Sequence, residues 1–263
     1  MRRLLSLCLV SFLAGCSLVV GGEVDDLQID RDAKRDVRVD LRDFTPHVGQ
    51  IVDVQIVEPD GALARAHAVI DPMPSDCVNI TFPRGAPLSA NRVDFFADLN
   101  MNRTLDQTPT DHSWRFELPE DGRLLYVHDV DFTNIGEVDP ATPGGQPLTV
   151  NITGADAFEG QRVVASVSRE DLIIDDLGNE MRLDTVPGIY VLGGVTGGVI
   201  AFELTGVIDG GAQHDIELAI GDGPTRCRTS AMAGGDGLTL EVDLSTIDCD
   251  DGAPRVVFED CAR

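Results

Sequence analysis

The sequence predicts an all-β protein made of two tandem immunoglobulin-like β-sandwich modules that follow a signal peptide and a short tether. Three observations support this fold class. Apolar and polar residues alternate over short runs along most of the chain, as they do in half-buried strands. Turn-forming clusters, such as EPDG at 58–61 and PEDG at 119–122, separate these runs. No long stretch repeats its apolar residues with the period of a helix.

The first module is predicted over residues 37–138. Its alternating runs are expected to form strands, and the turn clusters between them suit the hairpins of a sandwich. Residues 62–70, ALARAHAVI, leave strand and short helix open, because alanine favours helices while the residues alternate with charge. The expected strands are 37–41, 51–57, 77–82, 92–99, 113–118 and 124–132.

The expected boundary between the modules is residues 136–147, GEVDPATPGGQP, which are rich in proline and glycine. The second module is predicted over residues 148–263. Its alternating runs again have the length and spacing of sandwich strands. The expected strands are 148–153, 162–168, 188–193, 198–207, 214–221, 238–244 and 255–260.

The two halves resemble each other in sequence. Residues 37–57 align with residues 148–168 without a gap, and both segments contain a strand, an irregular stretch, a Gly-Gln turn and a second strand. Residues 93–102 align with residues 214–223 at a different offset. This similarity predicts a duplicated sandwich module, with chance similarity between hairpins as the alternative.

The N-terminal segment is typical of a secretory signal peptide. Arg2 and Arg3 precede an uncharged apolar run at residues 4–14, which is shorter than the roughly 20 residues of a membrane-spanning helix. The run ends in the sequence LAGC at residues 13–16.

This ending resembles the lipobox of bacterial lipoproteins. In that family the signal peptide is cut before the cysteine, whose thiol and new amino group are acylated. The resemblance implies that residues 1–15 are removed and that Cys16 is the lipidation site, which anchors the protein through its acyl chains. A plain cleaved signal with an incidental cysteine is the alternative. Residues 16–36 carry many charges and few large apolar residues, and are predicted to form the tether.

The chain is strongly acidic, with 20 Lys and Arg against 45 Asp and Glu and a formal net charge of −25. Loss of Arg2 and Arg3 with the signal peptide would make the charge about −27. Such a field repels nucleic acid and attracts cations, although solubility of a surface protein explains the same bias. We expect no nucleic-acid partner. The expected partners are the membrane, through the lipid on Cys16, and an unidentified protein or glycan.

Four cysteines remain for disulfides once Cys8 is removed with the signal peptide and Cys16 is lipidated. An even number of cysteines in an exported chain favours two disulfides, for which three pairings exist. The close spacing of Cys227 and Cys249 favours a local bridge, and a Cys77–Cys261 bridge would then tie the C-terminus to the first half. The candidate residues are Cys77, Cys227, Cys249 and Cys261.

Residues 98–112, DLNMNRTLDQTPTDH, place oxygen-bearing side chains at every second position over their first part. A calcium loop of the EF-hand type has ligands at positions 1, 3, 5, 7 and 9, glycine at 6 and an acid at 12. Counted from Asp98, positions 6 and 12 are Arg103 and Pro109, so the match is incomplete. An ordinary polar hairpin turn is the alternative. Calcium is the candidate cofactor, and the predicted metal ligands are Asp98, Asn100, Asn102, Asp106 and Asp111.

The sequence contains no nucleophile elbow, zinc-protease motif, P-loop or dinucleotide fingerprint. We therefore predict that the protein is not an enzyme. His112 and His128 lie on neighbouring predicted strands and could bind zinc or copper, although two histidines are a weak signal. His47, His67 and His214 are scattered along the chain and carry no spacing signal.

The arrangement as a whole resembles uncharacterised lipoproteins of myxobacterial-type genomes, which join a lipobox to tandem all-β modules with a strand running into a D-x-N-x-N turn. The lipobox implies a lipid-anchored protein of the cell envelope, and Ser17, at the position where an aspartate favours retention at the inner membrane, points to the outer membrane. The missing catalytic motifs favour a non-enzymatic role in binding, adhesion or structure. The alternatives are a calcium-dependent carbohydrate- or protein-binding module and, with less support, a secreted hydrolase with an unrecognised site.

Overall fold

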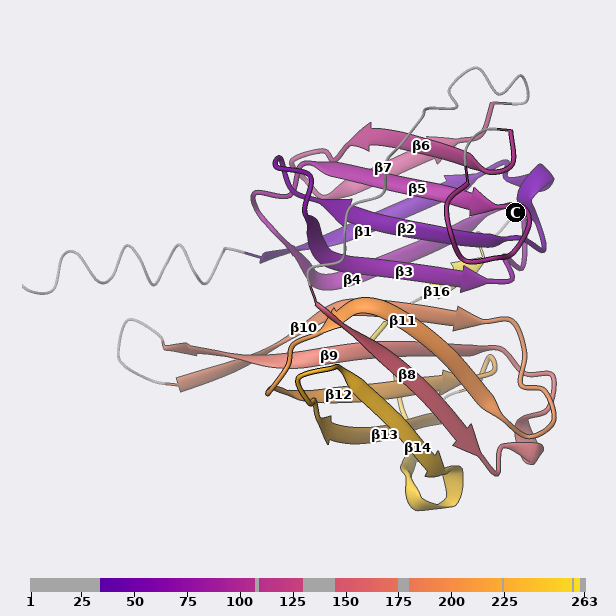
Figure 1. Cartoon of the computed structure of the whole chain (residues 1–263), viewed down its shortest axis with the longest axis vertical. Helices are drawn as coiled ribbons and strands as arrows, with labels where there is room; N and C mark the ends of the chain where they lie inside the picture. The colour runs from indigo at the N-terminus through magenta and orange to yellow at the C-terminus, as the bar shows by residue number, and fades with distance from the viewer. Residues whose placement is uncertain are drawn as a thin grey trace, which may run out of the picture.

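The described residues form an all-β protein, so the predicted fold class is confirmed. Figure 1 shows two sandwich-like halves stacked along the long axis of the molecule. Within the described ranges the helical elements are single 3-10 turns, and none of them could cross a membrane. The computed structural model describes residues 34–106, 109–129, 145–174, 180–223, 225–256 and 258–260.

The first half begins with a strand at Lys34, so the last three residues of the predicted tether belong to the sheet instead. Asp36 accepts a hydrogen bond from the backbone N–H of Arg84 (2.7 Å), which holds this charged segment in place. The predicted signal peptide, residues 1–15, and the rest of the tether, residues 16–33, lie outside the described residues. The elements are β1 (Lys34–Arg42), η1 (Thr45–His47), β2 (Ile51–Val57), β3 (Leu63–Asp71), β4 (Val78–Pro87), β5 (Arg92–Asp98), β6 (His112–Glu117) and β7 (Arg123–Val127).

The second half contains the strands expected from the sequence and two more at residues 225–232 and 248–251. Its elements are β8 (Gln146–Thr153), η2 (Asp156–Phe158), β9 (Val163–Ile174), β10 (Glu180–Leu192), β11 (Ile200–Ile208), β12 (Gln213–Ile220), β13 (Thr225–Met232), β14 (Leu238–Asp243), η3 (Leu244–Thr246), β15 (Asp248–Asp251) and β16 (Phe258–Asp260).

Both halves repeat the same strand pairing. In each half the first strand pairs in parallel with the seventh and antiparallel with the fourth: β1 with β7 and β4, and β8 with β14 and β11. Four further strands of each half form the opposite sheet, in the order β3-β2-β5-β6 and β10-β9-β12-β13, and β15 extends the second of these beyond β13. If the first seven strands of each half are lettered A to G in chain order, both halves have one sheet with the order D-A-G and an opposite sheet with the order C-B-E-F. This common topology supports the predicted duplication.

The aligned segments also agree in local structure. A 3-10 turn follows the first strand of each half, as η1 and η2. The glycine after this turn has a left-handed backbone in both halves, with φ of 85° at Gly49 and 74° at Gly160. Glycine adopts this conformation without steric cost, which explains the glycine of the shared Gly-Gln turn.

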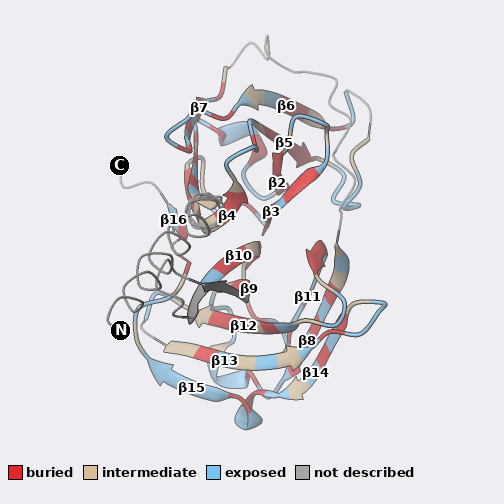
Figure 2. Cartoon of the chain, turned by 90° about the vertical axis from the view of Figure 1, so that its left-hand side faces the viewer, coloured by how far each residue is buried: buried red, intermediate tan, exposed pale blue. Residues whose placement is uncertain are grey.

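Each half closes a hydrophobic core between its two sheets. Val37 and Leu41 of β1 are fully buried in the first core, and Leu148 and Ile152 of β8 hold the aligned positions in the second. Val39 and Val150, midway between them, are buried as well, and the alternate residues face outward, which is the alternation that predicted these strands. Figure 2 shows the buried positions along the strands of both halves.

The two halves share one nine-stranded sheet within the described residues. β10 of the second half pairs in parallel with β3 of the first, beginning with Gly188 opposite His67. Because successive side chains of a strand point to opposite faces, Ile189 of β10 belongs to the first core and Tyr190 to the second. The sheet therefore continues through the junction without an edge.

The C-terminal strand returns to the first half. β16 pairs antiparallel with β4, with Asp260 opposite Val78, and Phe258 of β16 belongs to the first core. The predicted module boundaries, 37–138 and 148–263, stay predictions. The structure adds that two strands of the second segment, β10 and β16, pair with strands of the first.

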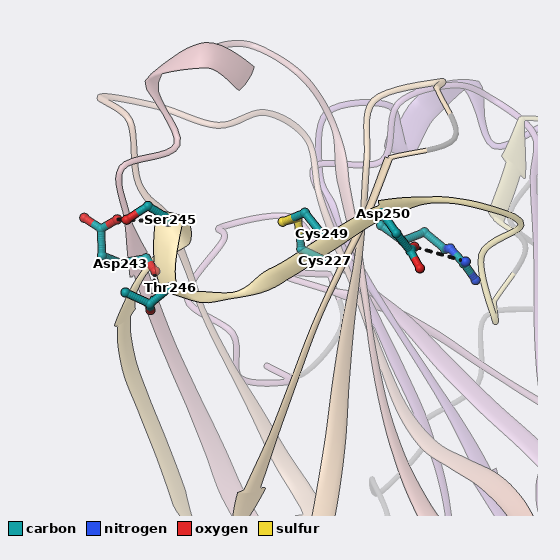
Figure 3. Close-up of a disulfide and its surroundings, with 7 residues drawn as sticks. Cys227, Asp243, Ser245, Thr246, Cys249 and Asp250 are labelled. Atoms are coloured by element: carbon teal, nitrogen blue, oxygen red, sulfur yellow. Dashed lines mark hydrogen bonds and ion pairs between the residues drawn. A yellow bond between two sulfur atoms is a disulfide. The ribbon is translucent and has the colours of Figure 1, made fainter.

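The disulfide Cys227–Cys249, predicted as a local bridge, is present. It joins β13 and β15, in which the two cysteines are register partners (Figure 3). Cys77 is also disulfide-bonded, and it precedes the strand that pairs with β16. Cys261 lies outside the described residues, so the Cys77–Cys261 bridge stays a prediction.

His67 links the two halves through hydrogen bonds made in a buried position. Its Nε2 lies 2.8 Å from Oδ2 of Asp53, and its Nδ1 lies 3.2 Å from the carbonyl oxygen of Thr205 in β11. Burial opposes the imidazolium cation, but the charge of Asp53 and these hydrogen bonds outweigh it and raise the pKa of His67. The cation can donate from both nitrogens at once.

We expect His67 to stabilise the fold mainly in its protonated form. Its folded-state pKa lies above the unfolded value of about 6.5, so its contribution is complete below about pH 6.5 and is lost as the pH rises through the raised pKa. The free energy of unfolding, measured in urea at several pH values, should therefore fall more steeply above about pH 6.5 in the wild type than in His67→Gln. Parallel pH profiles for the two proteins would contradict this role.

Candidate functional site

The five predicted metal ligands lie at the end of β5 and in the connection from β5 to β6. Asp98 is the last residue of β5 and Asp111 immediately precedes β6, and both carboxylates are buried. Asn100, Asn102 and Asp106 lie between them and are more accessible to solvent. The connection therefore has two buried acids at its ends and three polar side chains nearer the surface.

The buried carboxylates hold the backbone of this connection. Asp98 accepts hydrogen bonds from the backbone N–H groups of Asn102 (3.2 Å) and Arg103 (2.6 Å). Asp111 accepts from the N–H of Asp106 (2.7 Å) and from that of the residue after Asp98 (2.9 Å). Hydrogen bonds to a carboxylate are stronger than those between neutral groups, so these four contacts fix the loop.

The outer side chains contact one another. Oδ2 of Asp106 accepts from the side-chain amides of Asn100 (2.7 Å) and Asn102 (2.9 Å). Oδ1 of Asn102 accepts from the backbone N–H of Thr104 (2.8 Å). Residues 107–108 of the connection lie outside the described residues. The structure thus gathers the predicted oxygens, and their hydrogen bonds are made within the loop.

Arg103, at the position where a calcium loop has glycine, has a left-handed backbone with φ of 63°, and Met101 has φ of 58°. The guanidinium of Arg103 lies 3.1 Å from Oδ2 of Asp71 at the end of β3. The same oxygen accepts a hydrogen bond from the hydroxyl of Tyr190 in β10 (3.0 Å). The residue that departs from the calcium pattern therefore ties the loop to the junction of the halves.

A ready-made metal site is not seen in the part of the chain that the structure describes, where no three His, Cys, Asp or Glu side chains are grouped as ligands. Calcium binding by the loop stays a prediction, and it would require the loop oxygens to exchange hydrogen bonds for the ion. The sequence alignment places Ala219, Gly221 and Gly223 of the second half at the first three ligand positions. β5 and β12 occupy equivalent places in their sheets, and the aligned positions in the second half lack oxygen-bearing side chains. The oxygen-rich loop therefore belongs to the first half alone.

Three histidines meet beside this loop. His47 ends η1, His112 begins β6 and His128 follows β7. The ring centroid of His47 lies 5.3 Å from that of His112 and 5.0 Å from that of His128, and the Nε2 atoms of His47 and His128 are 3.2 Å apart. His47 and His128 are buried and His112 is half-buried. The sequence indicated His112 and His128 only, because nothing in its spacing connected His47 to them.

An aromatic cluster packs against these histidines. Trp114, the single tryptophan of the chain, has its ring centroid 5.4 Å from that of His47 and 5.7 Å from that of His128. Phe44 contacts both histidines, and Tyr126 packs against Trp114. These aromatic rings are buried, so they serve as core and as a wall of the histidine cluster.

Burial keeps the three imidazoles neutral. Desolvation lowers the pKa of His47 to about 4, outweighing its hydrogen bond to Gln50, and the nearby imidazoles act in the same direction. Burial likewise lowers the pKa of His112 and of His128, against the charges of neighbouring aspartates. At neutral pH each imidazole of the cluster is therefore neutral, with one of its two ring nitrogens unprotonated.

A recess at the junction of the halves is lined by basic side chains that include Lys34, Arg84, Arg65 and Arg169. Asp209 also lines it and pairs with Arg65 (2.6 Å) and with Arg169. These ion pairs connect β3, β9 and the end of β11. The recess is accordingly part of the junction between the halves.

No family model matches the chain, and neither does any curated protein. Among solved structures, the chain is similar to the crystal structure of group B streptococcus pilus 2b backbone protein. That match covers 84% of this chain and 87% of the other, at 11% sequence identity and a TM-score of 0.19. A TM-score this low carries no argument, so the functional interpretation rests on the sequence and geometry of this chain.

We expect Asp98→Asn to destabilise the protein even when calcium is chelated. Two backbone N–H groups now donate to the two oxygens of this buried carboxylate. In the variant, the side-chain NH2 group would replace one oxygen and face one of these N–H groups, so two donors would meet. The expected cost is about 2–3 kcal/mol in the free energy of unfolding. Urea unfolding in a chelator measures this loss. Asp222→Asn, at an exposed turn of the second half, is the control and should change the value by less than about 0.5 kcal/mol. Similar losses for the two variants would show that Asp98 does not hold the loop.

Proposed function

We propose that this chain is a lipid-anchored protein of the cell envelope with a non-enzymatic role in binding, adhesion or envelope structure. The observation that carries the proposal is the lipobox-like sequence LAGC at residues 13–16, placed directly after an apolar signal-like run. Acylation of Cys16 would hold the body at a membrane, with outer-membrane placement as the expected destination.

The architecture of the body supports a structural or binding role. A nine-stranded sheet joins the halves into one unit, and its strands β3 and β10 each contribute side chains to both cores. The buried carboxylates Asp98 and Asp111 accept hydrogen bonds from backbone N–H groups, an arrangement that holds a loop. General acid–base catalysis instead needs a carboxyl group directed at a substrate proton.

The lipid anchor is tested by Cys16→Ser. We expect the wild-type protein to sediment with the membrane fraction and to incorporate radiolabelled palmitate, whereas the variant should incorporate none and leave the membrane. Ser17→Ala, which keeps the acylated residue, is the control and should behave as the wild type. Palmitate labelling that persists in Cys16→Ser would refute the anchor, as would a wild-type chain found unacylated in the cytosol.

A calcium-dependent binding module is the second candidate function. It is favoured by the convergence of oxygen-bearing side chains in the β5–β6 connection, since calcium takes six to eight oxygen ligands. Asn100, Asn102 and Asp106 are in mutual contact near the surface, where an ion could reach them. An ion bound there would brace the loop for contact with a glycan or a protein.

Thermal unfolding with calcium and with chelator tests this candidate. An ion present at about 100 times its dissociation constant stabilises the folded state by about 2.7 kcal/mol, which is a rise of roughly 5–10 °C in Tm for a body of this size. Asp98→Ala should abolish the difference between the two conditions, whatever its effect on Tm itself, and Asp222→Ala should preserve it. The same Tm with calcium and with chelator in the wild type would leave the loop as a polar turn.

A further inference from the structure

We propose that His47, His112 and His128 form a binding site for a divalent transition metal of the zinc and copper class. Three separate elements, η1, the start of β6 and the end of β7, bring these imidazoles to one end of the first half. Imidazole nitrogen is a preferred ligand of zinc, copper and nickel, whereas calcium prefers oxygen. The site therefore differs in chemistry from the oxygen-rich loop beside it.

The distance between the two buried imidazoles fits a shared metal ion. Zinc–nitrogen bonds are about 2.0–2.1 Å long, so two nitrogens at a tetrahedral angle lie about 3.3–3.4 Å apart. The Nε2 atoms of His47 and His128 are 3.2 Å apart. Without metal, one of these nitrogens donates a proton to the other. With metal, that proton moves to Nδ1 of its own ring or is released, and both Nε2 atoms can bind the ion.

Gln50 fixes the orientation and the tautomer of His47. Its Oε1 accepts a hydrogen bond from Nδ1 of His47 (2.8 Å), while its Nε2 donates to the carbonyl of Pro46 (3.3 Å), which sets the direction of the amide. With the proton on Nδ1, the lone pair of His47 lies on Nε2, the atom that faces His128. Metal-binding histidines usually have such a partner on their second nitrogen.

His112 is placed to supply the third ligand. Its ring lies 5.3 Å from that of His47 between centroids, and it is half-buried, so the cluster reaches solvent on this side. Within the described residues, no three His, Cys, Asp or Glu side chains already surround one point as metal ligands. We therefore infer that the side chain of His112 rotates to complete the site when the metal binds. Rotation of this side chain would bring a ring nitrogen toward the Nε2 atoms of His47 and His128, and solvent would provide the fourth ligand.

The electrostatic setting also favours a cation. The net charge of −25 raises the local concentration of cations around the protein.

Copper titration of the full chain, prepared without a polyhistidine tag, tests the proposal. Trp114 packs against His47 and His128 and is the only tryptophan, so bound Cu²⁺ should quench its fluorescence. We expect the quenching to saturate at one equivalent, and excess Zn²⁺ but not Ca²⁺ to reverse it. Loss of the Gln50 hydrogen bond in Gln50→Ala should weaken binding about tenfold or more. The variants His47→Gln, His112→Gln and His128→Gln should each weaken it at least as much.

Two control variants should leave the copper affinity unchanged. His214→Gln changes a buried histidine of the second half, and Asp106→Asn changes a carboxylate of the adjacent loop. Circular dichroism establishes that each variant is folded. If His47→Gln and His128→Gln do not fold, the copper affinity of His112→Gln alone tests the proposal. An unchanged affinity in folded His112→Gln would overturn the proposal, as would quenching that does not saturate at one equivalent.

Discussion

The parallel pairing of β3 with β10 is the interaction on which the rest of the structure depends. β3 is the edge of a four-stranded sheet in the first half and β10 is the edge of a five-stranded sheet in the second, and an unpaired edge exposes a row of backbone N–H and C=O groups. Pairing the two edges satisfies both rows at once. Side chains of β10 then enter both cores, with Ile189 and Val191 in the first and Tyr190 in the second, while Val69 of β3 joins the second core. Neither core is complete without residues of the other half.

The duplicated topology permits the two halves to differ at their ends. A sandwich requires alternation along its strands, whereas its connections can vary without loss of the core. The second half has Phe158 at the position aligned with His47, and Ala219 at the position aligned with Asp98. The oxygen-rich loop and the histidine cluster therefore occur together at one end of the first half, on a scaffold that the second half reproduces without them.

The fold class and most strands could be predicted because a half-buried strand imposes a two-residue period on its sequence. The stretch 62–70 left strand and helix open, and its residues 63–70 belong to β3, since pairing with β2 and β10 outweighs the helix preference of alanine. Residues 225–232 gave no signal because their strand is polar. There Arg226 and Arg228 form ion pairs with acids of the adjoining strands. Such pairs depend on partners that are remote in sequence.

The same limit applies to the candidate sites. The spacing of Asp98 and Asp106 is local, so the sequence predicted that oxygens gather in the β5–β6 connection. The histidine cluster depends on three elements that meet only when the sheets pack, so His47 could not be connected to His112 and His128 in advance.

Asp71 makes the β5–β6 loop part of the junction between the halves. One oxygen of Asp71 accepts a hydrogen bond from Tyr190 and pairs with Arg103. Burial and the charge of Asp71 raise the pKa of Tyr190, so its hydroxyl keeps the proton that it donates. Arg103 lies in the tight turn of the loop, and Tyr190 lies in the second core, next to the pairing of β3 with β10. Through that shared oxygen the loop at the end of the first half is connected to the strand pairing that holds the halves together.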